Sequence, residues 1–358
     1  MSLPHDIIKP LIRLPGDWYA EVKPGTPFRD ILNLIKRGQN ICITGTYGFA
    51  MSFYAWLKKY IATRYPVHDY LSSRHSRSAL YELQTRIWLR FKNRLPELIN
   101  SPENHWITEF YPESDDFLMT FSDFLGMNGA RQWFEKGIQY PVISHRVHPF
   151  YGTYFPSRYD HLVLFDRWLS ANKNYDLAVD IGSGCGILSF IMRKHGIQSI
   201  HATDINPNAV YSFRQDIKRL PDKKAENLFV EQAHLLGSFV PRAGNLIVFN
   251  PPWIPGPAEK ALEQATYYDD GFFDRFFDEM SSACPVGTDI LLLFSNFAIV
   301  AGLTNNHPIE NALNKHKSQF QLIAFHKEKL SQKPSKKKSW LRALREKEEI
   351  ELFVIKRS

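Results

Sequence analysis

Asn250-Pro251-Pro252-Trp253 combines residue types that suit the binding of a planar amino group. The tetrapeptide follows Leu246-Ile247-Val248-Phe249, an apolar run that predicts a buried strand. Proline fixes its own φ angle and keeps the preceding residue out of the helical region, so Asn250 and Pro251 should be extended and stiff. The Asn250 side-chain oxygen and the Pro251 carbonyl can accept the two N–H groups of an amine, while Trp253 stacks on its plane. The alternative is a rigid turn with a packed tryptophan.

A glycine-rich turn, Gly182-Ser183-Gly184-Cys185-Gly186, follows a second predicted strand at residues 177–181. Glycine permits positive φ angles and close approach of the backbone to a ligand, and such a turn leaves amide groups facing that ligand at a helix start. A dinucleotide would suit this turn almost as well as any other nucleoside ligand. The turn alone therefore does not identify the ligand.

Asp204 narrows the choice, because it closes the next predicted strand at residues 199–205. A carboxylate there can accept hydrogen bonds from both ribose hydroxyls of a nucleoside. Its alternative use is to cap the following helix, but Asn206, with Pro207 after it, is the better candidate for the cap. Asp204 is therefore predicted to bind a ribose.

Predicted strands and helices alternate after residue 160, which is typical of βαβ units and a parallel sheet. Helices are expected over residues 187–195 and 208–220, and strands over residues 177–181, 199–205, 228–232, 246–250, 289–295, 319–326 and 350–355. The last two strands are too close in sequence for a parallel crossover. We therefore expect an antiparallel pair at that end of the sheet.

The first 140 residues are predicted to form a separate domain, α+β or mostly helical, because 358 residues exceed what one core usually serves. The pattern indicates a helix over 74–100, short helix and loop over 115–136, and one strand at 40–44. The turn Gly45-Thr46-Tyr47-Gly48 lacks the Gly-Lys-Ser/Thr ending of a phosphate loop and is interpreted as structural. The expected domains are thus 1–140, for substrate recognition, and 141–358, for catalysis.

The composition, with 44% hydrophobic and 23% charged residues, is that of an ordinary soluble globular protein. We find no apolar run long enough to span a membrane and no apolar secretory core near the N-terminus, so a cytoplasmic location is predicted. Three scattered cysteines are too few for a disulfide framework or a cysteine metal site. No metal is therefore expected.

The net charge of +7 is concentrated between Lys327 and Lys347, where nine basic residues face two acidic ones. Such a run can attract phosphates or a ribosomal surface. A solvated loop is the more usual role of a lysine run. Both interpretations stay open on the sequence alone.

Together these motifs resemble the amino-methylating branch of the S-adenosylmethionine-dependent methyltransferases, whose signature is Asn/Asp-Pro-Pro-aromatic after the fourth strand. Release-factor glutamine, ribosomal RNA guanine-N2 and adenine-N6 methyltransferases share it. The resemblance covers residues 145–355 approximately, and includes His148 to Arg158, which is similar to the segment that leads into this catalytic domain. It implies an α/β fold with a Rossmann-like seven-stranded methyltransferase sheet, an antiparallel last strand and S-adenosyl-L-methionine as cofactor.

Carried over by position, the resemblance implies that one set of residues contacts the cofactor, namely Asp180, Gly182, Gly184, Gly186, Asp204, Ile205, His234 and Asn250. His234 stands where these enzymes often place an acidic residue near the adenine, and a neutral imidazole, or the backbone groups of Ala233 and Leu235, can form a hydrogen bond there. The alternative is a surface histidine with no ligand. Asn250, Pro251 and Trp253 would bind the acceptor nitrogen. Residues 154–158 would border both pockets.

Three methyl acceptors suit this signature. A glutamine side-chain amide in a translation protein is favoured by the similarity around residues 148–158 and by the lack of a recognisable RNA-binding module. The basic run favours an exocyclic amine of ribosomal or transfer RNA, and a small-molecule amine is the third choice. A non-catalytic scaffold is disfavoured because a decayed site has no reason to keep Gly182, Gly184, Gly186, Asp204 and Asn250 together. An NAD-dependent dehydrogenase is disfavoured because Asn250-Pro251-Pro252-Trp253 has no role in hydride transfer.

Overall fold

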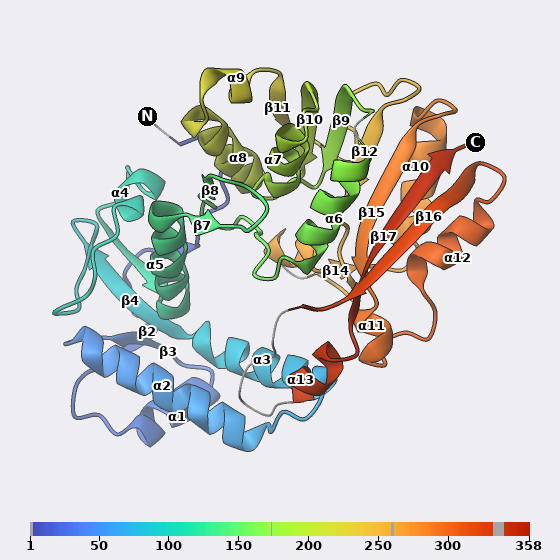
Figure 1. Cartoon of the computed structure of the whole chain (residues 1–358). Helices are drawn as coiled ribbons and strands as arrows, with labels where there is room; N and C mark the ends of the chain where they lie inside the picture. Colours follow the sequence, from blue (N-terminus) through green and yellow to red (C-terminus); the bar gives the residue numbers. More distant parts are fainter. Residues whose placement is uncertain (1–2, 173, 259–260, 332–339) are drawn as a thin grey trace. The chain divides into compact units, whose positions relative to one another are not determined.

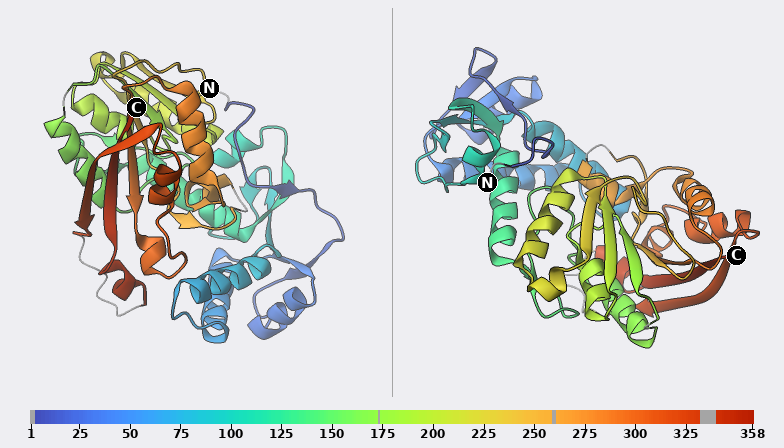
Figure 2. Two further views of the ribbon diagram at one scale, coloured as in Figure 1. Left: turned by 90° about the vertical axis from the view of Figure 1, so that its right-hand side faces the viewer. Right: turned by 90° about the horizontal axis from the view of Figure 1, so that it is seen from above.

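The computed structural model describes residues 3–172, 174–258, 261–331 and 340–358. It divides into two compact units, Met1–Gln132 and Trp133–Ser358, and each unit has its own sheet (Figures 1 and 2). In the part of the chain that is described, we find no helix with the length and apolar character needed to cross a membrane.

The C-terminal unit is built on a seven-stranded sheet with the order β11-β10-β9-β12-β15-β17-β16 (Figure 1). Neighbouring strands from β11 to β15 are parallel, whereas β17 is antiparallel to both β15 and β16. The strands are β9 (Leu177–Ile181), β10 (Ser199–Asp204), β11 (Leu228–Gln232), β12 (Leu246–Phe249), β15 (Asp289–Ser295), β16 (Phe320–Lys329) and β17 (Glu349–Arg357). This confirms the predicted Rossmann-like sheet with its antiparallel end.

Two hydrophobic cores cover the two faces of this sheet. Because successive side chains of a strand point to opposite faces, Leu246 and Val248 of β12 enter one core, while Ile247 and Phe249 enter the other. The first core packs against α6 (Asp160–Ala171), α7 (Ile187–Lys194) and α8 (Pro207–Arg219), and the second against α10 (Phe272–Ala283) and α12 (Pro308–Lys315). Burial on both faces explains why β12 is apolar throughout.

Smaller elements complete the C-terminal unit. They are β7 (Ile138–Gln139), β8 (Arg146–Val147), α9 (Asp222–Ala225), β13 (Ile254–Pro255), a 3-10 turn at Ala261–Ala265, β14 (Tyr267–Tyr268), α11 (Phe297–Val300) and α13 (Trp340–Arg345). The predicted cap of α8 is confirmed: the Asn206 side-chain oxygen accepts the Asn208 backbone N–H at 3.0 Å, and Pro207 occupies the first turn. The cap leaves Asp204 free for another role.

The N-terminal unit contains more sheet than the sequence predicted. Its six-stranded sheet has the order β1-β6-β4-β3-β2, with β5 on β4. The strands are β1 (Ile12–Arg13), β2 (Tyr19–Val22), β3 (Asn40–Ile43), β4 (Ile87–Lys92), β5 (Leu95–Pro96) and β6 (Asp116–Thr120), and the helices are α1 (Phe28–Lys36), α2 (Tyr47–Arg64), α3 (Tyr70–Gln84), α4 (Trp106–Phe110) and α5 (Phe121–Lys136). The recognition role of this unit stays a prediction.

Two predictions about this unit were wrong. The helix expected over 74–100 ends at Gln84, and β4 follows, because its apolar and aromatic residues are buried between β3 and β6. Residues 115–136, expected as short helix and loop, form strand β6 and the continuous helix α5. The helix runs through Gly126 and Gly129 because its buried residues, Phe121, Phe124 and Met127, hold it against the core.

The turn between β9 and α7 packs directly against α8. Gly186 has a φ angle of 78°, and a Cβ atom at this position would lie 2.3 Å from the buried Phe213 ring. No side chain fits there unless α7 and α8 separate. Glycine at this position therefore fixes how closely the two helices approach the strand ends.

We predict that Gly186→Ala lowers the free energy of unfolding by about 2 kcal/mol or more, because left-handed backbone strain adds to overpacking of Phe213. Gly196→Ala is the matched control: its φ angle is 91° but nothing lies within 4 Å of its Cβ position. Urea unfolding of both variants measures the difference. An equal loss in the two variants would show that the contact with Phe213 has no cost.

Candidate active site

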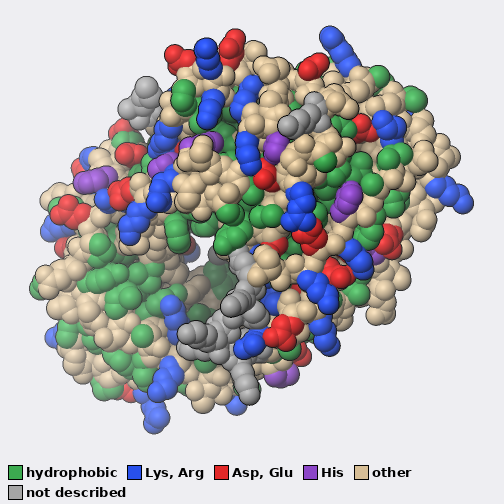
Figure 3. Space-filling view, viewed as in Figure 1, with side chains coloured by type: hydrophobic (Ala, Val, Ile, Leu, Met, Phe, Trp, Pro, Cys, Tyr) green, Lys and Arg blue, Asp and Glu red, His purple; other side chains and the backbone are tan. Residues whose placement is uncertain are grey.

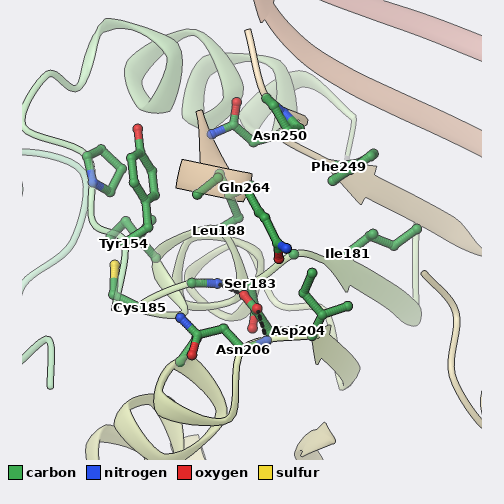
Figure 4. Close-up of a pocket in the computed structure, with 18 of the residues that line it drawn as sticks. Tyr154, Ile181, Ser183, Cys185, Leu188, Asp204, Asn206, Phe249, Asn250 and Gln264 are labelled. Carbon is green, nitrogen blue, oxygen red and sulfur yellow. Dashed lines mark hydrogen bonds between the residues drawn. The ribbon is translucent and has the colours of Figure 1, made fainter. Parts of the chain in front are cut away.

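A cavity opens at the carboxyl ends of the parallel strands, the edge where open α/β sheets bind ligands. It holds about 1050 Å³ of atom-free space, part of it open to solvent. The ends of β9, β10 and β12 contribute Ile181, Asp204 and Phe249, and Figure 4 shows Asn250 across the cavity from Asp204. Three separate strand ends therefore meet around one space.

The glycine turn after β9 forms the floor of this cavity. Gly184 has a φ angle of 52°, and a Cβ atom there would lie 3.0 Å from the Tyr154 carbonyl oxygen, so the turn needs glycine. Ser183 also lines the cavity, and its buried hydroxyl has no hydrogen-bond partner among the described residues. The Ser183, Gly184 and Gly186 N–H groups already donate within the protein, so the Ser183 hydroxyl is the polar group that the turn leaves for a ligand.

The Asp204 carboxylate is held in place by two backbone N–H groups. Its Oδ2 accepts the Gly184 N–H at 2.8 Å, and its Oδ1 accepts the Asn206 N–H at 2.8 Å. Burial raises the pKa of Asp204, and these two hydrogen bonds oppose that shift by stabilising the charged form. Each oxygen keeps a lone pair, so a fixed carboxylate faces the cavity with two acceptor positions.

The predicted cofactor residues fall into two groups. Gly182, Gly184, Asp204, Ile205, His234 and Asn250 line the cavity, whereas Asp180 and Gly186 are not among its described lining residues. Asp180 is fully buried, and its Oδ2 accepts the Ser189 N–H at 3.0 Å and the Ser189 hydroxyl at 2.6 Å. Burial raises the pKa of Asp180 to about 7. In this structure it joins β9 to the first turn of α7.

His234 lies at the rim of the cavity. Its side chain is 73% exposed, and its Nδ1 is 3.7 Å from a Glu279 carboxylate oxygen. Ala233 and Leu235 beside it also line the cavity, as does Ile205 from the end of β10. These residues give the edge near β11 an apolar surface with one polar ring.

These features fit S-adenosylmethionine. The Asp204 carboxylate suits the ribose hydroxyls, the unpaired Ser183 hydroxyl suits the polar methionine part, and Ile205 with Leu235 suits the adenine plane. Among the described residues, we find no cluster of side chains that could hold a metal ion.

Asn250 and Trp253 are joined by a hydrogen bond that the sequence did not predict. The Trp253 indole N–H lies 3.0 Å from Asn250 Oδ1 and 3.3 Å from the Leu293 carbonyl oxygen. The indole therefore sets which way the Asn250 amide faces. It packs edge-on against His161, with ring centroids 5.3 Å apart at 86°.

A second cavity begins on the other side of Asn250. It holds about 690 Å³ of atom-free space, part of it open to solvent, and both Pro251 and Trp253 line it. Asn250, Tyr154, Pro156, His161 and Ala265 line both cavities. Asn250 therefore stands at the junction of two spaces, one with nucleoside-binding features and one lined by Pro251 and Trp253.

The second cavity carries charged side chains from distant parts of the sequence. Arg158 and Arg345 both line it, and both pair with the fully buried Glu348: Arg345 donates a short hydrogen bond, and Arg158 lies 3.8 Å away. Burial is the main cause that lowers the pKa of Arg158. Among these three residues, the sequence predicted only Arg158 to lie beside a pocket. Lys333, Lys336, Lys337 and Lys338 of the basic run lie outside the described residues.

Comparisons with known proteins agree with this geometry. Residues 164–266 match the family model described as "Methyltransferase small domain". A Methanocaldococcus jannaschii protein named "Putative protein N5-glutamine methyltransferase" is 27% identical over 169 residues, which cover 44% of this chain and 79% of that protein.

Two of the solved structures similar to this chain are methyltransferases by name. A ribosomal protein L11 methylase from Lactobacillus delbrueckii subsp. bulgaricus is 16% identical, with a TM-score of 0.38 over 63% of this chain and 92% of that chain. A tRNA m1G37 methyltransferase from M. jannaschii is 18% identical, with a TM-score of 0.36 over 58% of this chain and 52% of that chain.

The family match spans β9, β10, β11 and β12, the strands whose ends enclose the larger cavity, and it includes the glycine turn, Asp204 and Asn250. Sequence, fold and comparison thus identify the same segment. Residues 164–266 match a methyltransferase small domain, and the protein is an S-adenosylmethionine-dependent methyltransferase.

Proposed function

We propose that this enzyme transfers the methyl group to a planar amino nitrogen, and that its acceptor is a glutamine side-chain amide of a translation protein. The observation that carries the proposal is the Asn250 amide at the junction of the two cavities, oriented by the Trp253 indole. The name of the M. jannaschii relative supports glutamine as the acceptor. The N-terminal unit would take part in recognising that protein.

The cofactor supplies an activated methyl group, so the protein mainly has to align the acceptor nitrogen with it. Asn250 Oδ1 accepts one hydrogen bond from Trp253 and keeps a lone pair for an acceptor N–H. Resonance makes an amide nitrogen a poor nucleophile. Hydrogen bonds to its N–H groups favour the more nucleophilic form and strengthen as positive charge develops on the nitrogen, which lowers the barrier.

An RNA amine is the second candidate, and the basic run between Lys327 and Lys347 is the observation that favours it. On the face in Figure 3, however, lysine and arginine are interspersed with acidic side chains over the C-terminal unit. Three basic residues of the run, Lys327, Arg342 and Arg345, are paired with carboxylates. Paired charges attract a phosphate backbone less than free ones do.

Methyl-labelled S-adenosylmethionine, added with the purified enzyme to an extract of cells that lack its gene, tests the proposal. We expect the label in protein, resistant to ribonuclease, and a peptide mass increase of one methylene group on a glutamine. Label that ribonuclease releases would replace the glutamine proposal with an RNA acceptor. Label in small molecules alone would refute both macromolecular acceptors.

We predict that Asp204→Ala weakens binding of S-adenosylmethionine and S-adenosylhomocysteine roughly 10- to 150-fold, the size of a lost hydrogen bond to a charged group. Calorimetry measures both affinities. Glu231→Ala is the matched control, because the Glu231 carboxylate at the next strand also accepts a backbone N–H, from Ser238, but is not among the residues that line the cavity. If both variants bind S-adenosylmethionine with equal affinity, Asp204 does not bind the cofactor.

We predict that Asn250→Ala lowers the turnover rate roughly 100-fold or more with little change in cofactor affinity, as when one pre-organised polar contact is removed from an active site. Asn250→Asp keeps an oxygen for the Trp253 indole and should retain part of the activity. Asn245→Ala at the opposite end of the same strand is the control, since Asn245 only caps a turn at Arg242. If cofactor-bound Asn250→Ala has full activity, Asn250 has no catalytic role and is only a turn residue.

A further inference from the structure

His161 is a buried histidine whose ring has no hydrogen-bond partner among the described residues. It lies in the first turn of α6, it is 2% exposed, and neither Nδ1 nor Nε2 is paired. An unpaired polar group in a protein interior costs about 1–3 kcal/mol, so such groups are retained where they have a use. Other residues of α6 that face the sheet, such as Leu162 and Phe165, are apolar.

The position of His161 points to a ligand. His161 is one of five residues that line both the larger cavity and the second cavity, and Asn250 is another. It packs edge-on against Trp253, and Trp253 donates to Asn250 Oδ1. Asn250, Trp253 and His161 are therefore one contiguous group at the point where the two cavities meet.

The protonation state of the ring fits the role of a hydrogen-bond acceptor. Burial lowers the pKa of His161 to about 4, and the nearby Asp160 only partly opposes that shift. The ring is thus neutral near pH 7, with one nitrogen as donor and the other as acceptor. Asp160 is itself engaged by the Ser331 N–H and hydroxyl, at 2.8 Å and 2.6 Å.

The amino group to be methylated needs an acceptor that can take up a proton as well as bind an N–H group, which neither the Asn250 amide oxygen nor the Pro251 carbonyl can do. It presents two N–H groups, while one of the lone pairs on Asn250 Oδ1 is already used by Trp253. After the methyl group has been transferred, the nitrogen also has to lose a proton. A neutral imidazole at the cavity junction can serve both needs.

We propose that His161 binds the acceptor amino group through a ring nitrogen and takes the proton that the methylated nitrogen releases; this inference rests on the proposed function. The nitrogen–carbon bond forms while the carbon–sulfur bond breaks, and the sulfur keeps that electron pair. The methylated nitrogen carries the positive charge until one proton passes to His161. The imidazolium then returns the proton to water. A weakly basic ring suffices, because an N-protonated amide is a far stronger acid than imidazolium.

His145 provides a matched comparison within the same unit. Its ring also packs edge-on against an aromatic ring, Phe190, at 4.7 Å and 86°, and its Nε2 is buried without a partner among the described residues. It is absent, however, from the described linings of both cavities. The two histidines therefore differ in access to a ligand and share their aromatic packing.

The test compares His161→Phe, His161→Gln and His145→Phe in the full-length enzyme. Phenylalanine keeps the ring and its packing against Trp253 but has no nitrogen, whereas glutamine restores an acceptor oxygen. We expect all three variants to bind S-adenosylhomocysteine with wild-type affinity within about twofold. His161→Phe should lose roughly 100-fold or more in kcat, the usual size of proton-transfer catalysis, with His161→Gln in between and His145→Phe unchanged.

A second measurement does not depend on turnover. In enzyme labelled with ¹⁵N-histidine and saturated with S-adenosylhomocysteine, the unmethylated glutamine peptide should shift the His161 ring resonances and leave those of His145 unchanged. Wild-type kcat in His161→Phe, or unchanged His161 resonances with a peptide that the wild-type enzyme methylates, would overturn the role of His161. If the wild-type enzyme methylates no glutamine, the proposed function itself fails. If His161→Phe does not fold, kcat of His161→Gln is compared with that of the wild type instead. A wild-type kcat in His161→Gln would then overturn the role of His161.

Discussion

The architecture of this enzyme depends on a backbone turn that leaves no room for side chains. A Cβ atom on Gly184 would lie 3.0 Å from the Tyr154 carbonyl oxygen, and a Cβ atom on Gly186 would lie 2.3 Å from the Phe213 ring. The turn after β9 thereby brings α8 and the segment before α6 against one point of the sheet. The Gly184 N–H bonds to Asp204, which ties the end of β10 to the same point. Without this contact between strand ends there would be no floor for a cavity.

The residues of the larger cavity and those of the second cavity differ in how readily the sequence predicts them. The residues on the cofactor side lie in short motifs directly after strands, so their types and spacing predict where they gather, and the structure brings Gly184, Asp204 and Asn250 to one cavity. Their roles in binding and catalysis remain predictions. His161 and Arg345 are single residues in helical segments, and a lone histidine or arginine has no spacing to distinguish it from a core or surface residue. Only the fold shows that they line the same space as Asn250.

The same contrast holds for the fold. The central strands of the C-terminal unit are buried on both faces, so their apolar runs are strong signals, and the seven-stranded sheet was predicted with its antiparallel end. In the N-terminal unit β4 mixes Arg90 with Trp88 and Phe91, and this pattern resembles one side of a helix. Pairing with β3 and β6 decides in favour of a strand, and that pairing joins residues far apart in the chain. The local sequence pattern of β4 does not show which distant strands will pair with it.

The position of β17 has a consequence for biosynthesis. This strand is the last in the sequence, yet it lies between β15 and β16 in the sheet, so β16 has no neighbour until β17 has been translated. Arg345, which lines the second cavity, and its ion-pair partner Glu348 directly precede it. The strands around the nucleoside pocket, by contrast, are complete by β12. On the ribosome, a nascent chain can therefore assemble the strands around the larger cavity early, whereas Arg345 reaches the second cavity only once the segment before β17 has been translated, so the two cavities are completed at different stages of synthesis.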